Sequence, residues 1–153
     1  MKLFKYTIVF LVINFGALAI GTVLMNNGPQ SDWYIHLNQA PWTPPGWVFG
    51  FAWTSIMLCF SIYMANLYVL QPKTKVKILF TVQFILNVIW NLVFFNMHLV
   101  ALGLAVILAL TVVVSVFMFT YRKLMPLISF LILPYFLWLL VATSLNAYIL
   151  FYN

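Results

Sequence analysis

The chain of 153 residues is 66% hydrophobic and 19% aromatic, only 5% of its residues are charged, and its mean hydropathy is +1.11. A soluble domain of this length needs far more surface charge, so the composition excludes a soluble globular protein and indicates a multi-pass membrane protein. The net charge of +6 does not indicate nucleic-acid binding, because the basic residues form short clusters between apolar segments.

Five apolar segments are long enough to cross a hydrocarbon core of about 30 Å as helices, which takes roughly 20 residues each. We predict these spans at Tyr6–Met25, Gly46–Leu70, Val76–Asn96, Leu99–Thr120 and Pro126–Phe151. The spans and their connections use up the whole chain. The fold class predicted is therefore an all-α membrane protein, with five transmembrane helices in a single bundle.

The first segment has two interpretations. A short basic region precedes it and Ala17-x-Ala19 is a tolerable cleavage site, as in a secretory signal peptide. Against cleavage, the apolar run continues through Met25, and Asn14 and Gly21 lie seven residues apart on one helical face, which is typical of packing. We favour a first transmembrane helix.

The basic residues predict the orientation of the bundle. They precede the first span or lie in the connections that follow the second and fourth spans: Lys2, Lys5, Lys73, Lys75, Lys77, Arg122 and Lys123. The other two connections contain no lysine or arginine. Since positive residues stay on the inner side of a membrane, we expect the N-terminus inside and the C-terminus outside.

The long outer connection, Asn26–Pro45, contains Asp32, the only acidic residue of the chain. Ser31 or Asp32 is placed to cap a short helix over Trp33–Leu37. The connection ends in prolines, and Pro44-Pro45 sets a rigid entry into the second span at about Gly46. We expect this connection to lie on the bundle as a lid.

Three spans carry stripes of aromatic and polar residues at helical spacing: Gln83, Asn87, Trp90, Asn91 and Phe94 in the third; Tyr135, Trp138, Ala142 and Asn146 in the fifth; and Gly46, Gly50, Trp53 and Met57 in the second. Polar side chains within spans usually face the bundle interior. One interpretation is hydrogen bonding and aromatic packing between helices. The other is a cavity with aromatic walls, suited to a large planar apolar ligand.

The depth of the tryptophans along their helices supports the interpretation as a cavity. At a rise of about 1.5 Å per residue, Trp53 and Trp90 lie roughly 10 Å below the outer ends of their helices and Trp138 about 20 Å below. Converging stripes would outline a cavity that opens outward, with the Pro-rich connection over its mouth.

The motif W-x-P-P-G-W-x-x-G-x-x-W spans Trp42–Trp53. It resembles the sequence that leads from the loop into the second helix in the translocator protein family, also called tryptophan-rich sensory proteins (TspO/MBR). Gln83-x-x-x-Asn87-x-x-Trp90 with Phe94-Phe95 is similar to the family's third helix. Pro134-Tyr135-x-x-Trp138 followed by Ala142–Asn146 is similar to its fifth. The resemblance covers the whole chain, so we expect residues 1–153 to form one TspO/MBR-like transmembrane domain.

The resemblance implies a receptor or sensor that binds porphyrins, such as protoporphyrin IX or haem, in a bacterial cell membrane. It requires no other cofactor and no protein metal site. His36 is interpreted as a solvated interfacial residue, with ligation of a metalloporphyrin as the alternative. The candidate ligand-binding residues are Trp42, Trp53, Gln83, Asn87, Trp90, Tyr135, Trp138, Ala142 and Asn146.

Two other functions remain open. The first is transport or export of tetrapyrroles, although the spans contain no ionisable residue of the kind that coupled transport usually needs, except lysine and arginine at the helix ends. The second is light-dependent porphyrin degradation, which has been proposed for bacterial members of the family and would involve Trp53 and Trp138. No carboxylate pair or nucleophile–base set predicts any other catalytic residue.

Two further features concern partners. Ala101, Ala105 and Ala109 form a small-xxx-small row that fits a homodimer or, equally well, packing within one bundle. Some members of the family bind sterols, but no cation follows Tyr148 here, so the loose sterol motif is incomplete at the end of the fifth span.

Overall fold

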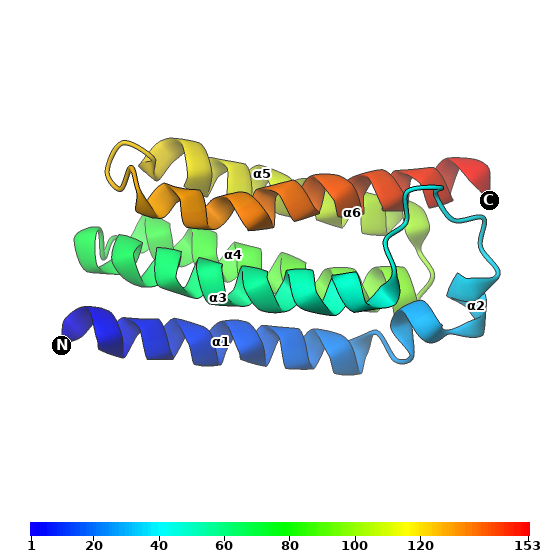
Figure 1. Cartoon of the computed structure of the whole chain (residues 1–153), viewed down its shortest axis with the longest axis horizontal. Helices are drawn as coiled ribbons and strands as arrows, with labels where there is room; N and C mark the ends of the chain where they lie inside the picture. Colours follow the sequence, from blue (N-terminus) through cyan, green and yellow to red (C-terminus); the bar gives the residue numbers. More distant parts are fainter.

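Five long, apolar helices make up most of the computed structural model, which describes residues 1–153 (Figure 1). They are α1 (Lys2–Leu24), α3 (Gly46–Leu70), α4 (Thr74–Asn91), α5 (Val100–Tyr121) and α6 (Leu133–Tyr152). Short helical turns add η1 (Gly28–Gln30), α2 (Asp32–Ile35), η2 (Leu92–Asn96) and η3 (Ile128–Ile132). The structure has no strand, and the predicted all-α fold with five helices able to span a membrane is confirmed.

The long helices form a closed ring. α1 packs against α3 and α4, α4 against α5, α5 against α6, and α6 with η3 against α3. Successive helices run in opposite directions, so the N-terminus and the connections 71–73 and 122–127 share one end (Figure 1). We call this the basic end, because all seven lysine and arginine residues lie at it. The opposite end, with α2 and the C-terminus, is the loop end.

The helix boundaries differ from the predicted ones by a few residues, most at α1, which begins at Lys2 rather than at Tyr6. The third span ends in a π-helical turn, η2, which buries Phe94 and Phe95 side by side. The fifth span begins at Ile128, two residues later than predicted, as a 3-10 turn that leads into α6. Pro134 lies in the first turn of α6, where its missing N–H leaves no helical hydrogen bond unmade.

α1 is an integral member of the bundle. Its buried face consists of Phe10, Asn14, Ala17 and Gly21, as the predicted packing face requires. Asn14 Nδ2 donates to Ser61 Oγ on α3 over 2.8 Å, and Ser61 Oγ donates to its own helix at the Met57 carbonyl. A buried polar pair of this kind holds two helices together where water is absent.

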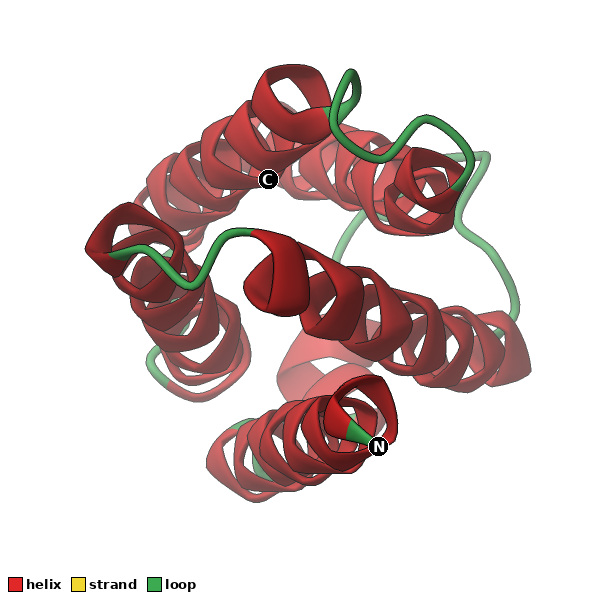
Figure 2. Ribbon diagram, turned by 90° about the vertical axis from the view of Figure 1, so that its left-hand side faces the viewer, coloured by secondary structure: helices red, strands yellow, loops and turns green.

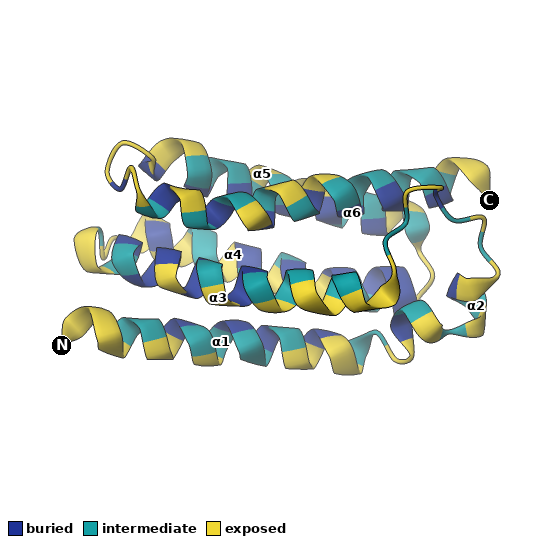
Figure 3. Cartoon of the chain, in the orientation of Figure 1, coloured by how far each residue is buried: buried dark blue, intermediate teal, exposed yellow.

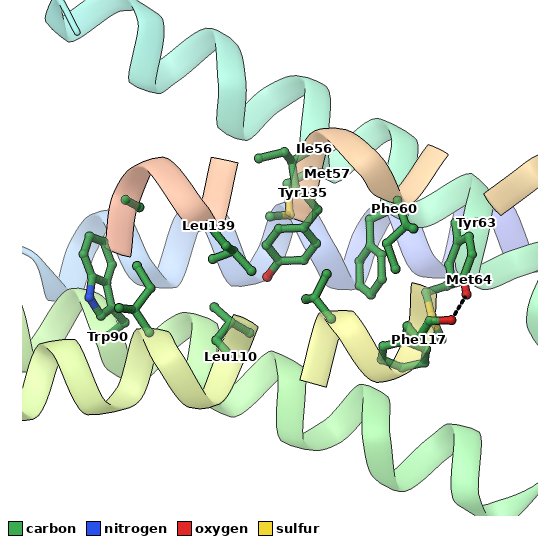
Figure 4. Close-up of a cluster of buried hydrophobic side chains, with 14 of the residues drawn as sticks. Ile56, Met57, Phe60, Tyr63, Met64, Trp90, Leu110, Phe117, Tyr135 and Leu139 are labelled. Atoms are coloured by element: carbon green, nitrogen blue, oxygen red, sulfur yellow. Dashed lines mark hydrogen bonds between the residues drawn. The ribbon is translucent and has the colours of Figure 1, made fainter. Parts of the chain in front are cut away.

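Aromatic side chains fill the core between α3, α5 and α6 (Figure 4). The Phe60 ring meets the Tyr135 ring edge-on, with centroids 5.2 Å apart. Tyr63 donates its hydroxyl to the Phe117 carbonyl over 2.9 Å, which satisfies a buried polar group inside the core.

The outer surface of the bundle is apolar. Along each long helix exposed positions alternate with buried ones (Figure 3), and the exposed positions include Val12, Phe51, Val112 and Leu137. A soluble monomer rarely exposes apolar surface on this scale, whereas lipid chains cover it readily. The row of Ala101, Ala105 and Ala109 is also exposed, so the bundle does not use it for its own packing.

Candidate ligand-binding site

The connection at the loop end folds back onto the bundle. Ser31, rather than Asp32, caps α2, since its Oγ accepts a hydrogen bond from the Tyr34 N–H over 3.3 Å. The helix ends at Ile35, two residues before the predicted Leu37. Tyr34 packs beneath it against Phe95, with ring centroids 5.4 Å apart, and this burial raises the pKa of the Tyr34 phenol.

Three further contacts hold this connection in place. Trp33 stacks on His98 with centroids 4.2 Å apart and 16° between the ring planes. The Asn38 backbone N–H donates to Asn153 Oδ1 over 2.8 Å, and Asn153 Nδ2 returns a hydrogen bond of 3.2 Å to the Asn38 carbonyl. Trp42 Nε1 donates to Ser144 Oγ on α6 over 3.1 Å. The connection therefore lies on the ends of α6 and η2.

A cavity of about 300 Å³ lies among α1, α3, α4 and α6 toward the loop end. Its lining residues are Ala17, Leu18, Thr22 and Met25 of α1; Pro29; Gly46, Phe49, Gly50, Trp53 and Thr54 of α3; Asn87, Trp90, Asn91 and Phe95 of α4 and η2; and Trp138 and Ala142 of α6. Its volume lies at the lower end of the range for small-molecule sites, about 300–1,000 Å³.

Aromatic rings form much of the cavity wall, and neighbouring rings hold them. The Phe49 and Trp138 rings meet edge-on at 5.3 Å, which joins α3 to α6 across the cavity. Trp53 meets the buried Tyr135 ring at 6.1 Å and 71°. Trp90 Nε1 donates to Asn146 Oδ1 over 3.3 Å, so its ring orientation is fixed as well. Such edge-on pairs stabilise an arrangement beyond the effect of area burial alone.

Two amides of α4 supply the polar part of the wall. Asn91 Nδ2 donates to the Asn87 carbonyl over 3.1 Å and fits against α1 because residue 21 is glycine. A Cβ at Gly21 would lie 2.8 Å from Asn91 Nδ2. The Asn87 side chain also lines the cavity and is 5% exposed. Trp138 Nε1, on the facing helix α6, is buried and has no hydrogen-bond partner in the protein. Its N–H is free to donate to a polar group of a ligand.

The cavity opens sideways, between α1 and α3. Its exposed lining residues are Thr22 of α1 and Gly46, Gly50 and Thr54 of α3. The two helices are joined by Asn14 and Ser61 nearer the basic end and diverge toward the loop end, as Figure 2 shows. No atom lies within 4 Å of a Cβ built on Gly46 or Gly50. Within the connection 26–45, which the sequence predicts to cover the mouth, Pro29 is the one residue that lines the cavity.

The structure divides the candidate site residues into two groups. Trp53, Asn87, Trp90, Trp138 and Ala142 line the cavity together. The remaining four, Trp42, Gln83, Tyr135 and Asn146, do not line it.

Each of these four residues has a contact that accounts for its position. Gln83 Nε2 donates to Tyr135 Oη over 2.7 Å, behind the Trp53 ring, and both side chains are buried. Asn146 accepts from Trp90 and donates to the Val100 carbonyl, and it lines only a minor cavity of about 20 Å³. Trp42 is 54% exposed at the loop end.

His36 is likewise outside the cavity. It is exposed, and its Nδ1–H donates to the Asp32 carbonyl over 2.7 Å. This position agrees with a solvated residue rather than with a ligand to a group held in the cavity.

Sequence reasoning missed the contribution of α1. Ala17, Leu18, Thr22 and Met25 have no side chain with distinctive chemistry, and only their spacing along the face begun by Asn14 pointed toward the interior. Phe49 and Thr54 of α3 were missed for the same reason.

Comparison with known proteins places the chain in a family. A model of the TspO/MBR family matches residues 8–152. The tryptophan-rich sensory protein of Cereibacter sphaeroides is 33% identical over 115 residues, which cover 75% of this chain and 73% of that protein. The tryptophan-rich protein TspO of Bacillus cereus is 31% identical over 150 residues, 93% of each chain. The translocator protein of Homo sapiens is 29% identical over 125 residues, 78% of this chain and 74% of that protein. With five helices able to span a membrane and a family match along nearly its whole length, this multi-pass membrane protein belongs to the TspO/MBR family.

Proposed function

We propose that the chain is a membrane receptor or sensor that binds a planar apolar ligand, a porphyrin such as protoporphyrin IX or haem, in the cavity among α1, α3, α4 and α6. The observation that carries this proposal is the composition of the cavity wall. Trp53, Trp90 and Trp138 line one space together with the Asn87 side chain, and the buried Trp138 Nε1–H has no hydrogen-bond partner in the protein. Flat apolar walls with one free polar group suit a planar ligand with a few heteroatoms.

The size and opening of the cavity suggest how such a ligand lies. A volume of about 300 Å³ is small for a tetrapyrrole, so part of the ring remains in the opening between α1 and α3. Trp53 and Trp138 then contact the inserted part. Packing against an aromatic ring contributes about 0.5–1.5 kcal/mol beyond area burial.

The test is a titration of the purified protein with protoporphyrin IX, followed by quenching of tryptophan fluorescence. Trp53→Phe and Trp138→Phe each keep most of the apolar contact, so we expect each to weaken binding several-fold, in line with a loss of about 1 kcal/mol. Trp47→Phe is the matched control: Trp47 belongs to the same helix as Trp53 but is 72% exposed and lies outside the cavity. Binding that is absent, or that responds equally to all three changes, contradicts the proposal.

Light-dependent degradation of the bound porphyrin is a second candidate. The observation that favours it is that Trp53 and Trp138 line the same cavity from different helices, so that both can contact one ligand. Measuring both the porphyrin affinity and the rate of light-dependent porphyrin loss of Trp53→Phe and Trp138→Phe separates degradation from binding alone.

A further inference from the structure

The start of α1 and the turn between α3 and α4 meet at the basic end of the bundle (Figure 1). Phe10 of α1 packs edge-on against Phe80 of α4, with ring centroids 5.0 Å apart. One turn nearer the basic end, the Tyr6 ring of α1 lies 4.8 Å from the Tyr68 ring of α3. The Lys77 ammonium of α4 lies over that same Tyr68 ring, 5.8 Å from its centroid. Three helices therefore bring Tyr6, Tyr68 and Lys77 to one place.

Helical spacing places two more lysines beside Lys77. Lys2 precedes Tyr6 by four residues, so the two lie on the same face of α1. Lys73 is the N-cap of α4 and precedes Lys77 by four residues, which places it one turn farther toward the basic end. All three lysines are exposed. We call these three lysines, together with Tyr6 and Tyr68, the lysine–tyrosine patch.

No acidic side chain balances the charge of this patch. Asp32, the only acidic residue, belongs to α2 at the loop end. The lysines are also unfavourable for their own helices, because α1 and α4 have no acidic residue in the first turn, where the helix dipole favours negative charge. Arg122 and Lys123 differ, since they follow the C-terminal end of α5, where the dipole favours a cation.

The surroundings of the patch indicate where a partner of opposite charge comes from. The patch lies at the ends of the candidate membrane spans Lys2–Gln30, Gly46–Leu70 and Thr74–Asn96. Tyrosine is enriched at this level, where hydrocarbon meets the lipid headgroups. Exposed apolar side chains, such as Ile8 on α1 and Ile78 on α4, continue from the lysines into the spans. A molecule with an anionic headgroup and apolar chains matches both surfaces.

We propose that the lysine–tyrosine patch binds an anionic phospholipid, such as phosphatidylglycerol, from the leaflet that surrounds the basic end. The lysine ammonium groups pair with the lipid phosphate, while the Tyr68 ring holds the Lys77 ammonium beside it by a cation–π contact. A lysine close to an anionic membrane surface raises affinity by about fivefold. The patch shares no residue with the cavity lining, so this inference is independent of the proposed function.

Native mass spectrometry of the purified protein tests the proposal, because it counts the lipids that remain bound. Phosphatidylglycerol and phosphatidylcholine with the same acyl chains are added in equal amounts. We expect phosphatidylglycerol to bind about tenfold more tightly, because only it carries a net negative charge for the lysines to pair with. Lys73→Gln/Lys77→Gln removes two cations from the patch and should lower this preference about fivefold or more.

Arg122→Gln/Lys123→Gln is the matched control. It removes the same charge from the same end of the bundle, but from the connection after α5, which packs on α4 away from α1. It should lower the preference by less than about twofold, since these residues lie outside the patch. An equal loss in both double variants overturns the proposal, because the preference then reflects net charge alone. Equal binding of the two lipids by the unchanged protein overturns it as well.

A second measurement distinguishes a membrane lipid from a soluble phosphate ester. Glycerophosphoglycerol carries the headgroup of phosphatidylglycerol without the acyl chains. We expect it to compete poorly with the lipid, because it cannot contact the apolar side chains beside the patch. Competition as strong as that of the lipid itself overturns the assignment to a membrane lipid. Circular dichroism of each variant shows that its helices are intact.

Discussion

Replacing Tyr135 with phenylalanine separates a role in ligand binding from a role in holding helices together. Tyr135 Oη accepts the 2.7 Å hydrogen bond from Gln83 Nε2, and Tyr135 is fully buried. Phenylalanine keeps the ring, and with it the edge-on contacts to Trp53 and Phe60. Only the hydrogen bond is lost, on the side of the ring that meets α4 rather than at the cavity wall.

The expected loss of stability follows from the surroundings of Gln83. Its Oε1 already has no partner, and at 1% exposure the side chain cannot turn toward water or lipid headgroups. Hydrogen bonds between membrane helices contribute about 0.6 kcal/mol on average. A buried donor that loses its partner costs about 1–3 kcal/mol. Since the Gln83 amide has no alternative partner, we expect Tyr135→Phe to lower the free energy of unfolding by about 1–2 kcal/mol.

Unfolding in detergent micelles measures this loss, and a porphyrin titration of the same samples measures binding. We expect binding to stay close to that of the unchanged protein. The double variant Gln83→Met/Tyr135→Phe removes both partners and should recover most of the lost stability, because no buried polar group is then left unpaired. The structural role of Tyr135 would be refuted if Tyr135→Phe left the stability unchanged and weakened porphyrin binding roughly tenfold. A tenfold change corresponds to about 1.4 kcal/mol.

Three further predictions concern topology, association and chemistry. With Cys59→Ser as background, a single cysteine at Asn27 should react with a membrane-impermeant reagent from outside and one at Lys75 should not, because we expect the positively charged basic end to stay inside. Labelling at position 75 in intact cells contradicts this orientation. Ala105→Leu should lower the yield of cross-linked dimer, since it blocks close approach at an exposed small-residue row, and an unchanged yield in folded protein argues against an interface there. If indoles take part in photochemistry, Trp138→Phe should slow light-dependent loss of bound porphyrin far more than it weakens binding, whereas equal effects leave Trp138 as a wall of the site.

The helices could be predicted from the sequence because hydrocarbon thickness and apolar length constrain them so strongly. The second long helix begins at Gly46 as predicted, because Pro44-Pro45 cannot lie inside it. The inward stripes were predictable too: Gln83 and Asn87 are both buried in the bundle. In each case a local property of the chain (apolar length, a proline pair or the spacing of polar residues) determines the observed structure.

The site was less predictable, because it depends on how helices rotate and diverge. Gln83 and Asn87 lie one turn apart on α4, yet Gln83 meets Tyr135 whereas Asn87 faces the cavity. Which amide finds a partner depends on the neighbouring helix, and spacing along one helix does not contain that information. The sideways opening likewise follows from the divergence of α1 and α3 beyond the Asn14–Ser61 contact, which no local pattern encodes.

The paired hydrogen bonds between Asn38 and Asn153 affect the choice of terminus for an affinity tag. The Asn153 side chain satisfies both the N–H and the C=O of Asn38, much as a neighbouring strand does in a sheet. It thereby divides the long connection at the loop end into two shorter segments, each of which loses less conformational entropy when its ends are fixed. An affinity tag fused directly after Asn153 crowds this contact. A tag placed before Met1 lies at the opposite end of the bundle and leaves the connection as it is (Figure 1).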